Sequence, residues 1–202
     1  LPARPMSWVS IAGSQPASPT PSLRGLRRSL SERGSSDVPR PFDVSTTSPA
    51  TVGQVYSAFA DKGYWRDRLA EFGGDSIRLD SLVVEPGSVF VGTTQNLRHD
   101  GLPVLIAKVM PGDLKVVREE TWRLIGEDEL RGNVVITTAG APISGTATAL
   151  VSRVAEGSVL RFTGTVQVKV PLIGGQIEKY IGSQIVEEIP GVQRFTTRWI
   201  SE

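Results

Sequence analysis

The sequence predicts an α+β domain over residues 41–202, in which a curved antiparallel sheet wraps a long C-terminal helix. Three observations predict this arrangement. Apolar and polar residues alternate through the middle of the chain, and glycine- and proline-rich turns separate the alternating stretches, which is typical of strands joined by hairpins. Two short helical patterns precede these stretches. One long helical pattern follows them, with apolar residues at steps of three and four.

The segment before the sheet combines a first strand with two short helices. Residues 42–46 alternate apolar and polar side chains, as a half-buried strand does. Ser48 is expected to cap the first helix, with Pro49 at its first position. Asp61 is expected to cap the second helix, which the glycine pair 73–74 ends.

The alternating stretches predict strands joined by tight turns, and in the first of them Ile77, Leu79, Ser81 and Val83 are expected to share one face. Residues 101–110 are expected to form a short helix or lid segment. A helix is expected over 172–189. Pro190–Gly191, which follow this range, are expected to kink or break the helix. The expected strands cover 75–85, 88–97, 114–125, 130–138, 144–154 and 158–170.

Composition excludes several classes of protein. The chain has 202 residues, of which 39% are hydrophobic and 21% charged, as in ordinary soluble globular proteins. No apolar run approaches the ~20 residues that a membrane-spanning helix needs, so no transmembrane segment is expected. The absence of cysteine excludes disulfides and thiolate chemistry, and it is consistent with a cytoplasmic location.

Residues 1–40 differ from the rest of the chain. They are rich in serine, proline and arginine and show no periodicity, so we expect a disordered basic tail that is dispensable for folding. The tail is either a genuine flexible segment or an upstream extension from a misassigned start. The remaining residues are mildly acidic, so the tail does not indicate a nucleic-acid-binding face on the fold, and no nucleic-acid partner is expected.

No catalytic residue, metal site or cofactor is predicted. His99 is the only histidine, and its polar neighbours indicate a solvated loop. The stretches 87–92 and 140–145 have the glycine spacing of a phosphate-binding loop but lack the lysine that follows it. Glu119 and Glu120 are adjacent on a predicted strand, so they point to opposite faces and do not form a catalytic carboxylate pair.

The stretch from Phe42 through Ser48–Val52 to Tyr64–Trp65 contains a strand, a helix started by proline, and an aspartate followed by an aromatic pair. This stretch resembles the usual beginning of the START-like (SRPBCC) superfamily, whose helix-grip fold has the same order of elements. The resemblance covers about residues 41–200 and implies a helix-grip fold with a ligand-binding cavity, but no activity. Pro190–Gly191 departs from the continuous final helix of that superfamily. Five motifs resemble a bacterial branch that is a domain of unknown function family, namely Tyr64–Leu69 with Gly73–Gly74, Arg118–Trp122, Ser144–Thr146, Val170–Lys179 and Gln193–Trp199.

The strand over 114–125 carries the candidate binding residues. Arg118 and Glu120 share the parity of its apolar residues, so both should point toward the helix. One interpretation is a structural ion pair near the sheet edge or the cavity mouth. The other is that Arg118 anchors a ligand carboxylate or phosphate through its bidentate fork, with Gln95 as a second polar contact. The apolar residues expected to line the cavity are Trp122, Phe162, Val166, Ile177, Ile181 and Ile185.

Three functions remain open. The leading hypothesis is a non-enzymatic binder or carrier of a hydrophobic small molecule or lipid, because a curved sheet over one helix leaves room for a pocket of roughly 300–1,000 Å³. The second is a cyclase- or dehydratase-type enzyme acting on a polyketide-like substrate, which a buried polar cluster with a perturbed pKa would favour. The third is an interaction module with a collapsed cavity and the basic tail as its contact. The sequence identifies neither the ligand nor the oligomeric state.

Overall fold

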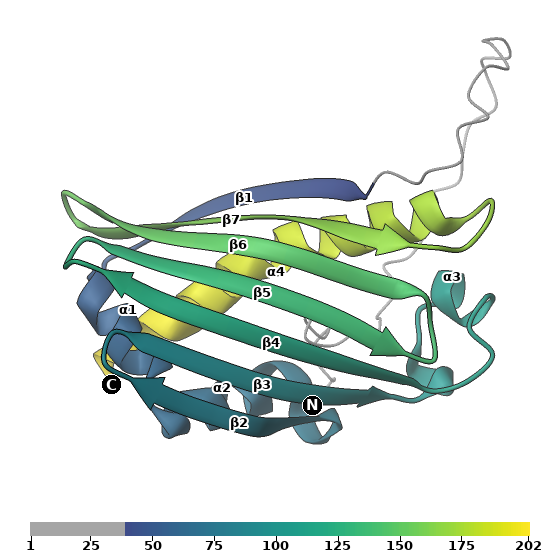
Figure 1. Ribbon diagram of the computed structural model, residues 1–202, viewed down its shortest axis with the longest axis horizontal. Coiled ribbons are helices and arrows are strands. Elements are labelled where there is room, and N and C mark those ends of the chain that lie inside the picture. Colours follow the sequence, from purple (N-terminus) through teal and green to yellow (C-terminus); the bar gives the residue numbers. More distant parts are fainter. Residues whose placement is uncertain (1–38) are drawn as a thin grey trace, which may run out of the picture.

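A curved antiparallel sheet and the long helix that ends the chain form the two main layers of the computed structural model, which describes residues 39–202 (Figure 1). The predicted disordered tail lies outside the described residues, apart from its last two positions. The helices are α1 (Val52–Phe59), α2 (Lys62–Gly73), α3 (Val104–Ala107) and α4 (Gly174–Ser201). The strands are β1 (Arg40–Ser48), β2 (Ile77–Glu85), β3 (Ser88–Leu97), β4 (Leu114–Ile125), β5 (Glu129–Ala139), β6 (Ile143–Val154) and β7 (Gly157–Val168).

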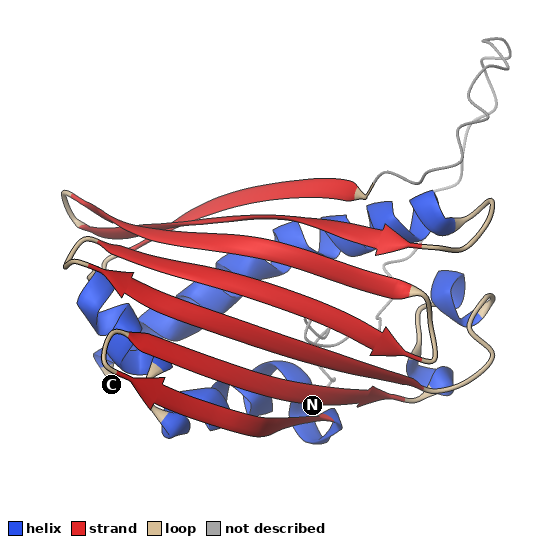
Figure 2. Cartoon of the chain, viewed as in Figure 1, coloured by secondary structure: helices blue, strands red, loops and turns tan. Residues whose placement is uncertain are grey.

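The strands pair in the order β1-β7-β6-β5-β4-β3-β2, each antiparallel to its neighbours. β2 to β7 follow one another as hairpins, and β1 closes the far edge by pairing with β7. Figure 2 shows α1, α2 and α4 on one side of the sheet, and none of the described helices covers the other side. The predicted α+β helix-grip architecture is therefore confirmed.

Helix α4 lies against β1 and β7, and its start is attached closely to the end of β7. A side chain at Gly174 would collide with the carbonyl oxygen of Val168, so glycine permits the close approach of the helix to the end of β7. The buried carboxylate of Glu178 accepts a hydrogen bond of 2.8 Å from the backbone N–H of Val168. The apolar face of the helix is thereby directed onto the sheet, with Ile177, Ile181 and Ile185 almost fully buried.

Helix α1 begins later than predicted. Its N-cap is Thr51, whose hydroxyl accepts from the backbone N–H of Gln54, while the side chain of Gln54 accepts from the backbone N–H of Thr51. This reciprocal capping box satisfies two free N–H groups, whereas a Ser48 cap has no such return bond. Ser48 ends β1 instead, and its hydroxyl accepts from the backbone N–H of Ala50. The predicted Asp61 cap of α2 is confirmed by a 2.6 Å bond from the N–H of Gly63.

The prediction that Ile77, Leu79, Ser81 and Val83 share one face of β2 is wrong. A bulge between Leu79 and Ser81 inserts one residue, so that Leu79 pairs with Thr93 but Ser81 pairs with Gly92. An inserted residue reverses the alternation beyond it, because successive side chains point to opposite faces. Leu82 therefore takes the inward position that the sequence pattern assigned to its neighbours, and it packs against the core.

A kink or a break was predicted at Pro190, and the break is wrong, because α4 is helical without interruption from Gly174 to Ser201. Proline removes one backbone donor from a helix and crowds the preceding turn. The turns on both sides of Pro190 nevertheless pack into the same core, through Ile185 before it and Phe195 after it. Packing on both sides keeps the helix continuous.

Gly132 on β5 provides a test of core packing beside Trp122. A methyl carbon added at Gly132 would lie 2.5 Å from the Trp122 ring, so Gly132→Ala should force that ring to move. We expect a loss of about 1–3 kcal/mol in the free energy of unfolding, measured by urea denaturation. The matched control is Gly53→Ala in α1, where nothing lies within 4 Å of the added carbon. It should stabilise the protein by up to about 1 kcal/mol, and equal effects of both changes would contradict this packing.

Candidate functional site

The residues predicted to line a cavity all face the space between the sheet and α4. Six of them are apolar, and the three polar ones come from the neighbouring strands β3 and β4. Each is at least nine-tenths buried, which agrees with the inward parity that the sequence assigned to them. They are Gln95, Arg118, Glu120, Trp122, Phe162, Val166, Ile177, Ile181 and Ile185.

Three inward side chains of β4 form a hydrogen-bonded row. The Nε of Arg118 donates to one carboxylate oxygen of Glu120 at 2.6 Å, and the Nε1 of Trp122 donates to the other at 3.0 Å. β4 lies between β3 and β5, so this ion pair is inside the sheet and not on an edge strand. Gln95 lies on the adjacent β3 and donates to the hydroxyl of Ser76 at 3.1 Å.

Helix α2 adds a second buried cation that the sequence analysis missed. Arg68 is 5% exposed, and its guanidinium carbon lies 4.8 Å from the centre of the Trp65 ring. Burial alone would lower the pKa of Arg68, but Tyr64 and Glu120 more than offset this and raise it. Helical spacing was the available signal, because Arg68 follows the aromatic pair 64–65 by three and four residues and so shares its buried face.

Tyr64 connects this cluster to α4. Its hydroxyl is 2.8 Å from that of Thr196, which also donates to the backbone oxygen of Val192 in the preceding turn. Burial raises the pKa of Tyr64, so the phenol stays neutral. The polar cluster therefore spans three elements, α2, β4 and α4, at the inner side of the sheet.

The pKa values of the two acidic groups near Arg118 are shifted in opposite directions. Burial acts to raise the pKa of Glu120, but Arg118 and Arg68 outweigh it and hold that pKa below its usual value. Glu188 on α4 has a pKa raised to about 9 by burial, which the attraction of Arg118 opposes and the charge of Glu187 reinforces. Within residues 39–202 Glu188 forms no ion pair. At neutral pH it is protonated, whereas Glu120 is ionised.

These protonation states leave the cluster with a net charge. Arg68 and Arg118 contribute two positive charges, Glu120 contributes one negative charge, and neutral Glu188 contributes none, so the sum is +1. Buried charges are normally paired because removing them from water is costly. The arrangement therefore has the electrostatic character of a site for one anionic group.

The space enclosed beside this cluster is small. An apolar hollow lined by Phe42, Ile136, Phe162, Val166 and Ile185, among others, has a volume of about 10 Å³. That volume is at the lower limit for holding one water molecule. Three of the predicted cavity residues thus lie at the same hollow, but their side chains fill it almost completely.

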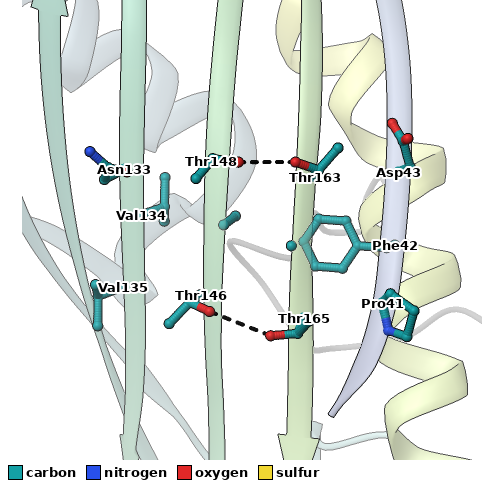
Figure 3. A pocket seen from close by; sticks show the side chains of 12 residues that line it. Pro41, Phe42, Asp43, Asn133, Val134, Val135, Thr146, Thr148, Thr163 and Thr165 are labelled. Carbon is teal, nitrogen blue, oxygen red and sulfur yellow. Dashed lines mark hydrogen bonds between the residues drawn. The ribbon is translucent and has the colours of Figure 1, made fainter.

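A larger depression of about 670 Å³ lies on the outer face of the sheet. Figure 3 shows its threonines, which hydrogen-bond across β6 and β7 as Thr146 with Thr165 and Thr148 with Thr163. Asp43 at its border is paired with Arg161 at 2.7 Å. The depression is shallow and open, and its hydroxyl groups and carboxylate already have partners, so we do not regard it as the site.

Metal-binding clusters and membrane-spanning helices are both absent from the part of the chain that the structure describes. Residues 39–202 contain no group of three or more His, Cys, Asp or Glu side chains placed to hold a metal ion. In the same range, no helix has the length and apolarity to cross a membrane. His99 is exposed on the loop after β3, as the sequence predicted, and its ring lies 3.2 Å from the backbone oxygen of Ala107.

The fold and the buried cluster define an α+β protein of the helix-grip type. Within that class the chain belongs to the family described as "Protein of unknown function (DUF2505)", whose sequence profile matches residues 43–200. The prediction of a domain of unknown function family is therefore confirmed. The crystal structure of TTHA0849 from Thermus thermophilus is similar in fold, with a TM-score of 0.53 and 14% identity over 80% of this chain and 97% of that one.

Two mycobacterial relatives are similar over most of their length. Uncharacterized protein Rv0481c of Mycobacterium tuberculosis (strain ATCC 25618 / H37Rv) is 37% identical over 171 residues, which is 81% of this chain and 98% of that protein. Uncharacterized protein Mb0491c of Mycobacterium bovis matches with the same identity and coverage. Their names assign no activity.

The raised pKa of Glu188 makes stability depend on pH. The folded protein holds a proton that the unfolded chain releases between the ordinary pKa of 4.5 and about 9. The carboxyl group therefore contributes stability that is complete below the lower value and is lost as the pH rises toward the upper one. Relative to Glu188→Gln, the wild-type protein should lose up to about 1.4 kcal/mol per pH unit in this window.

Urea denaturation at pH 5, 7 and 9 measures this difference, with Glu127→Gln as the control. Glu127 is exposed in the turn between β4 and β5, away from Glu188, so its substitution should leave the pH profile nearly unchanged. Parallel profiles for the wild type and Glu188→Gln would show that Glu188 is ionised in the folded protein at neutral pH.

Proposed function

We propose that the protein binds a hydrophobic small molecule or lipid between α4 and the concave face of the sheet, as a member of the START-like superfamily. The observation that supports this best is the pairing of two apolar walls with a buried polar cluster. Ile177, Ile181 and Ile185 form one wall, and Phe162 and Val166 contribute to the other. Such a combination of apolar walls and few polar groups is typical of small-molecule sites.

Binding at this place requires the walls to separate. The hollow of about 10 Å³ is far below the volume of a lipid chain, so a ligand has to displace side chains or move α4 away from the sheet. Gly145, which has no side chain, and Ala147, whose side chain is one methyl group, lie at the same hollow and leave the adjacent side chains room to rearrange. The ligand-free interior is accordingly the closed state in this proposal.

A collapsed interior was also the observation expected to favour an interaction module. The small hollow agrees with that alternative, but the contact it invoked is the basic tail, which lies outside the described residues. A packed structural core gains nothing from an unbalanced buried charge, which instead destabilises it. The cluster of Arg68, Arg118 and Glu120 therefore favours ligand binding over a purely structural interior.

Ala147→Leu tests the binding site directly. The added carbons extend into the hollow between β6 and α4, so apolar ligands should bind about tenfold more weakly or not at all. The measurement is titration with a neutral environment-sensitive dye and with fatty acids, on samples whose folding is checked by circular dichroism. Val135→Leu, on the outer face of β5, is the matched control and should bind as the wild type does. A folded wild-type protein that saturates with none of these probes would refute the proposed function.

A second candidate is a cyclase- or dehydratase-type enzyme acting on a polyketide-like substrate, and Glu188 is the observation that favours it. A carboxyl group that remains protonated at neutral pH is suited to act as a general acid. The α-proton of the substrate would pass to solvent water, and Arg118 would stabilise the negative charge that forms on the carbonyl oxygen. Glu188 would then donate its proton to the β-hydroxyl group, which leaves as water, and would regain a proton from solvent. This role requires the same interior site as the binding function does.

Mass spectrometry of a β-hydroxy thioester incubated with the protein tests this candidate. An enzyme of this kind should release the dehydrated product, and Glu188→Gln should lower the rate about a hundredfold or more, whereas Glu187→Gln should retain it. Wild-type protein that binds the thioester without converting it would leave the carrier function as the better description.

Cell fractionation tests the cytoplasmic location that belongs to the same proposal.

A further inference from the structure

Resting on the proposed function, we infer that the ligand is an acid, an amphipathic molecule whose carboxylate or other oxyanion binds the terminal nitrogens of Arg118. Its apolar part lies along the face of α4 that carries Ile181 and Ile185.

The first step is the charge of the buried cluster. Arg68 and Arg118 are both at least nine-tenths buried, and Glu120 forms an ion pair with Arg118 while its charge also acts on Arg68. One positive charge therefore has no counterion among residues 39–202. A neutral ligand would leave that charge unbalanced, and a cationic ligand would add repulsion, whereas an anion neutralises it.

The second step is the geometry of the Arg118 guanidinium. An arginine side chain has five N–H donors, and Arg118 uses the one on Nε to bind Glu120 at 2.6 Å. Within residues 39–202 its two terminal nitrogens have no hydrogen-bond partner, and its side chain keeps 11% of its surface exposed. The outer edge of the guanidinium is thus accessible, and that edge matches the two oxygens of a carboxylate.

The third step distinguishes Arg118 from Arg68. The guanidinium of Arg68 lies over the Trp65 ring and beside the hydroxyl of Tyr64, so neighbouring side chains of its own helix already occupy it. Arg118 faces the helix across the interior instead. Its charge acts on Glu188 of α4, yet the two side chains form no ion pair within the described residues.

The fourth step connects the head group to the apolar wall. Ile181 and Ile185 precede Glu188 by seven and three residues, which places all three on the same face of α4. A chain that lies along this face reaches Arg118 at the level of Glu188. There the protonated carboxyl group of Glu188 donates a hydrogen bond to the bound oxyanion, opposite Arg118.

The test compares dodecanoic acid with dodecanol, which share a twelve-carbon chain and differ in the head group. The affinity of each is measured at pH 7.5 by displacement of a neutral apolar dye from the full-length protein. The wild type should bind the acid at least tenfold more tightly than the alcohol. Arg118→Met should weaken binding of the acid tenfold or more and change that of the alcohol by less than threefold.

Arg118→Met leaves Glu120 buried without its partner, so that variant alone is open to misfolding. The double variant Arg118→Met/Glu120→Gln removes both charges and keeps an acceptor for the Nε1 of Trp122, and it should show the same selective loss. Arg78→Met, on an exposed arginine of β2, is the control and should bind both probes as the wild type does.

The outcomes separate the inference from the proposed function. Equal losses for the acid and the alcohol, or a wild type that binds the alcohol as tightly as the acid, would overturn the acid head group and leave apolar binding intact. A folded wild-type protein that binds neither probe nor the dye would overturn the proposed function itself.

Discussion

The buried carboxylate of Glu120 is the constraint on which the interior of this protein depends. Its two oxygens accept from Arg118 and Trp122 of its own strand, and the charge of Arg68 reaches it from α2. Removing such a group from water is costly, so each of these neighbours has to be held in place. The surrounding aromatic side chains provide that support, since Phe59 lies 4.6 Å from Trp122 and 5.7 Å from Trp65 between ring centres. The packing of α1 and α2 against the sheet is thereby tied to one acidic side chain.

A buried ion pair of this kind is weak evidence for stability, because hydrophobic residues of similar volume often serve a fold as well or better. Its position is more informative. The cluster lies on a strand inside the sheet, opposite a helix whose facing carboxyl group is neutral, and its charges do not cancel. Under the proposed function, this cluster contributes to ligand recognition more than to the stability of the fold.

The two faces of the sheet differ in the same respect. The outer face carries threonines that bond to one another across β6 and β7, and its charged border residue Asp43 is paired with Arg161 (Figure 3). Every one of these groups is satisfied locally and remains in contact with solvent. The inner face combines nearly closed apolar packing with unbalanced charge. The outer depression has the larger volume, but the unbalanced buried charge lies in the interior. The proposed binding site is placed in the interior for that reason.

The sequence by itself determined the order of the elements and the inward direction of Arg118 and Glu120. Both follow from local periodicity, since alternation along a strand and steps of three and four along a helix depend only on nearby residues. The predicted Ser48 cap of α1 was wrong because two nearby residues compete to cap the helix. The reciprocal bond with Gln54 makes Thr51 the cap. The bulge after Leu79 and the continuous helix through Pro190 depend on what packs against them. Only the tertiary structure placed Arg68 and Glu188 in the same interior region as Arg118 and left the hollow nearly closed. The three residues come from α2, α4 and β4, which are far apart in the sequence, so local periodicity cannot predict their proximity.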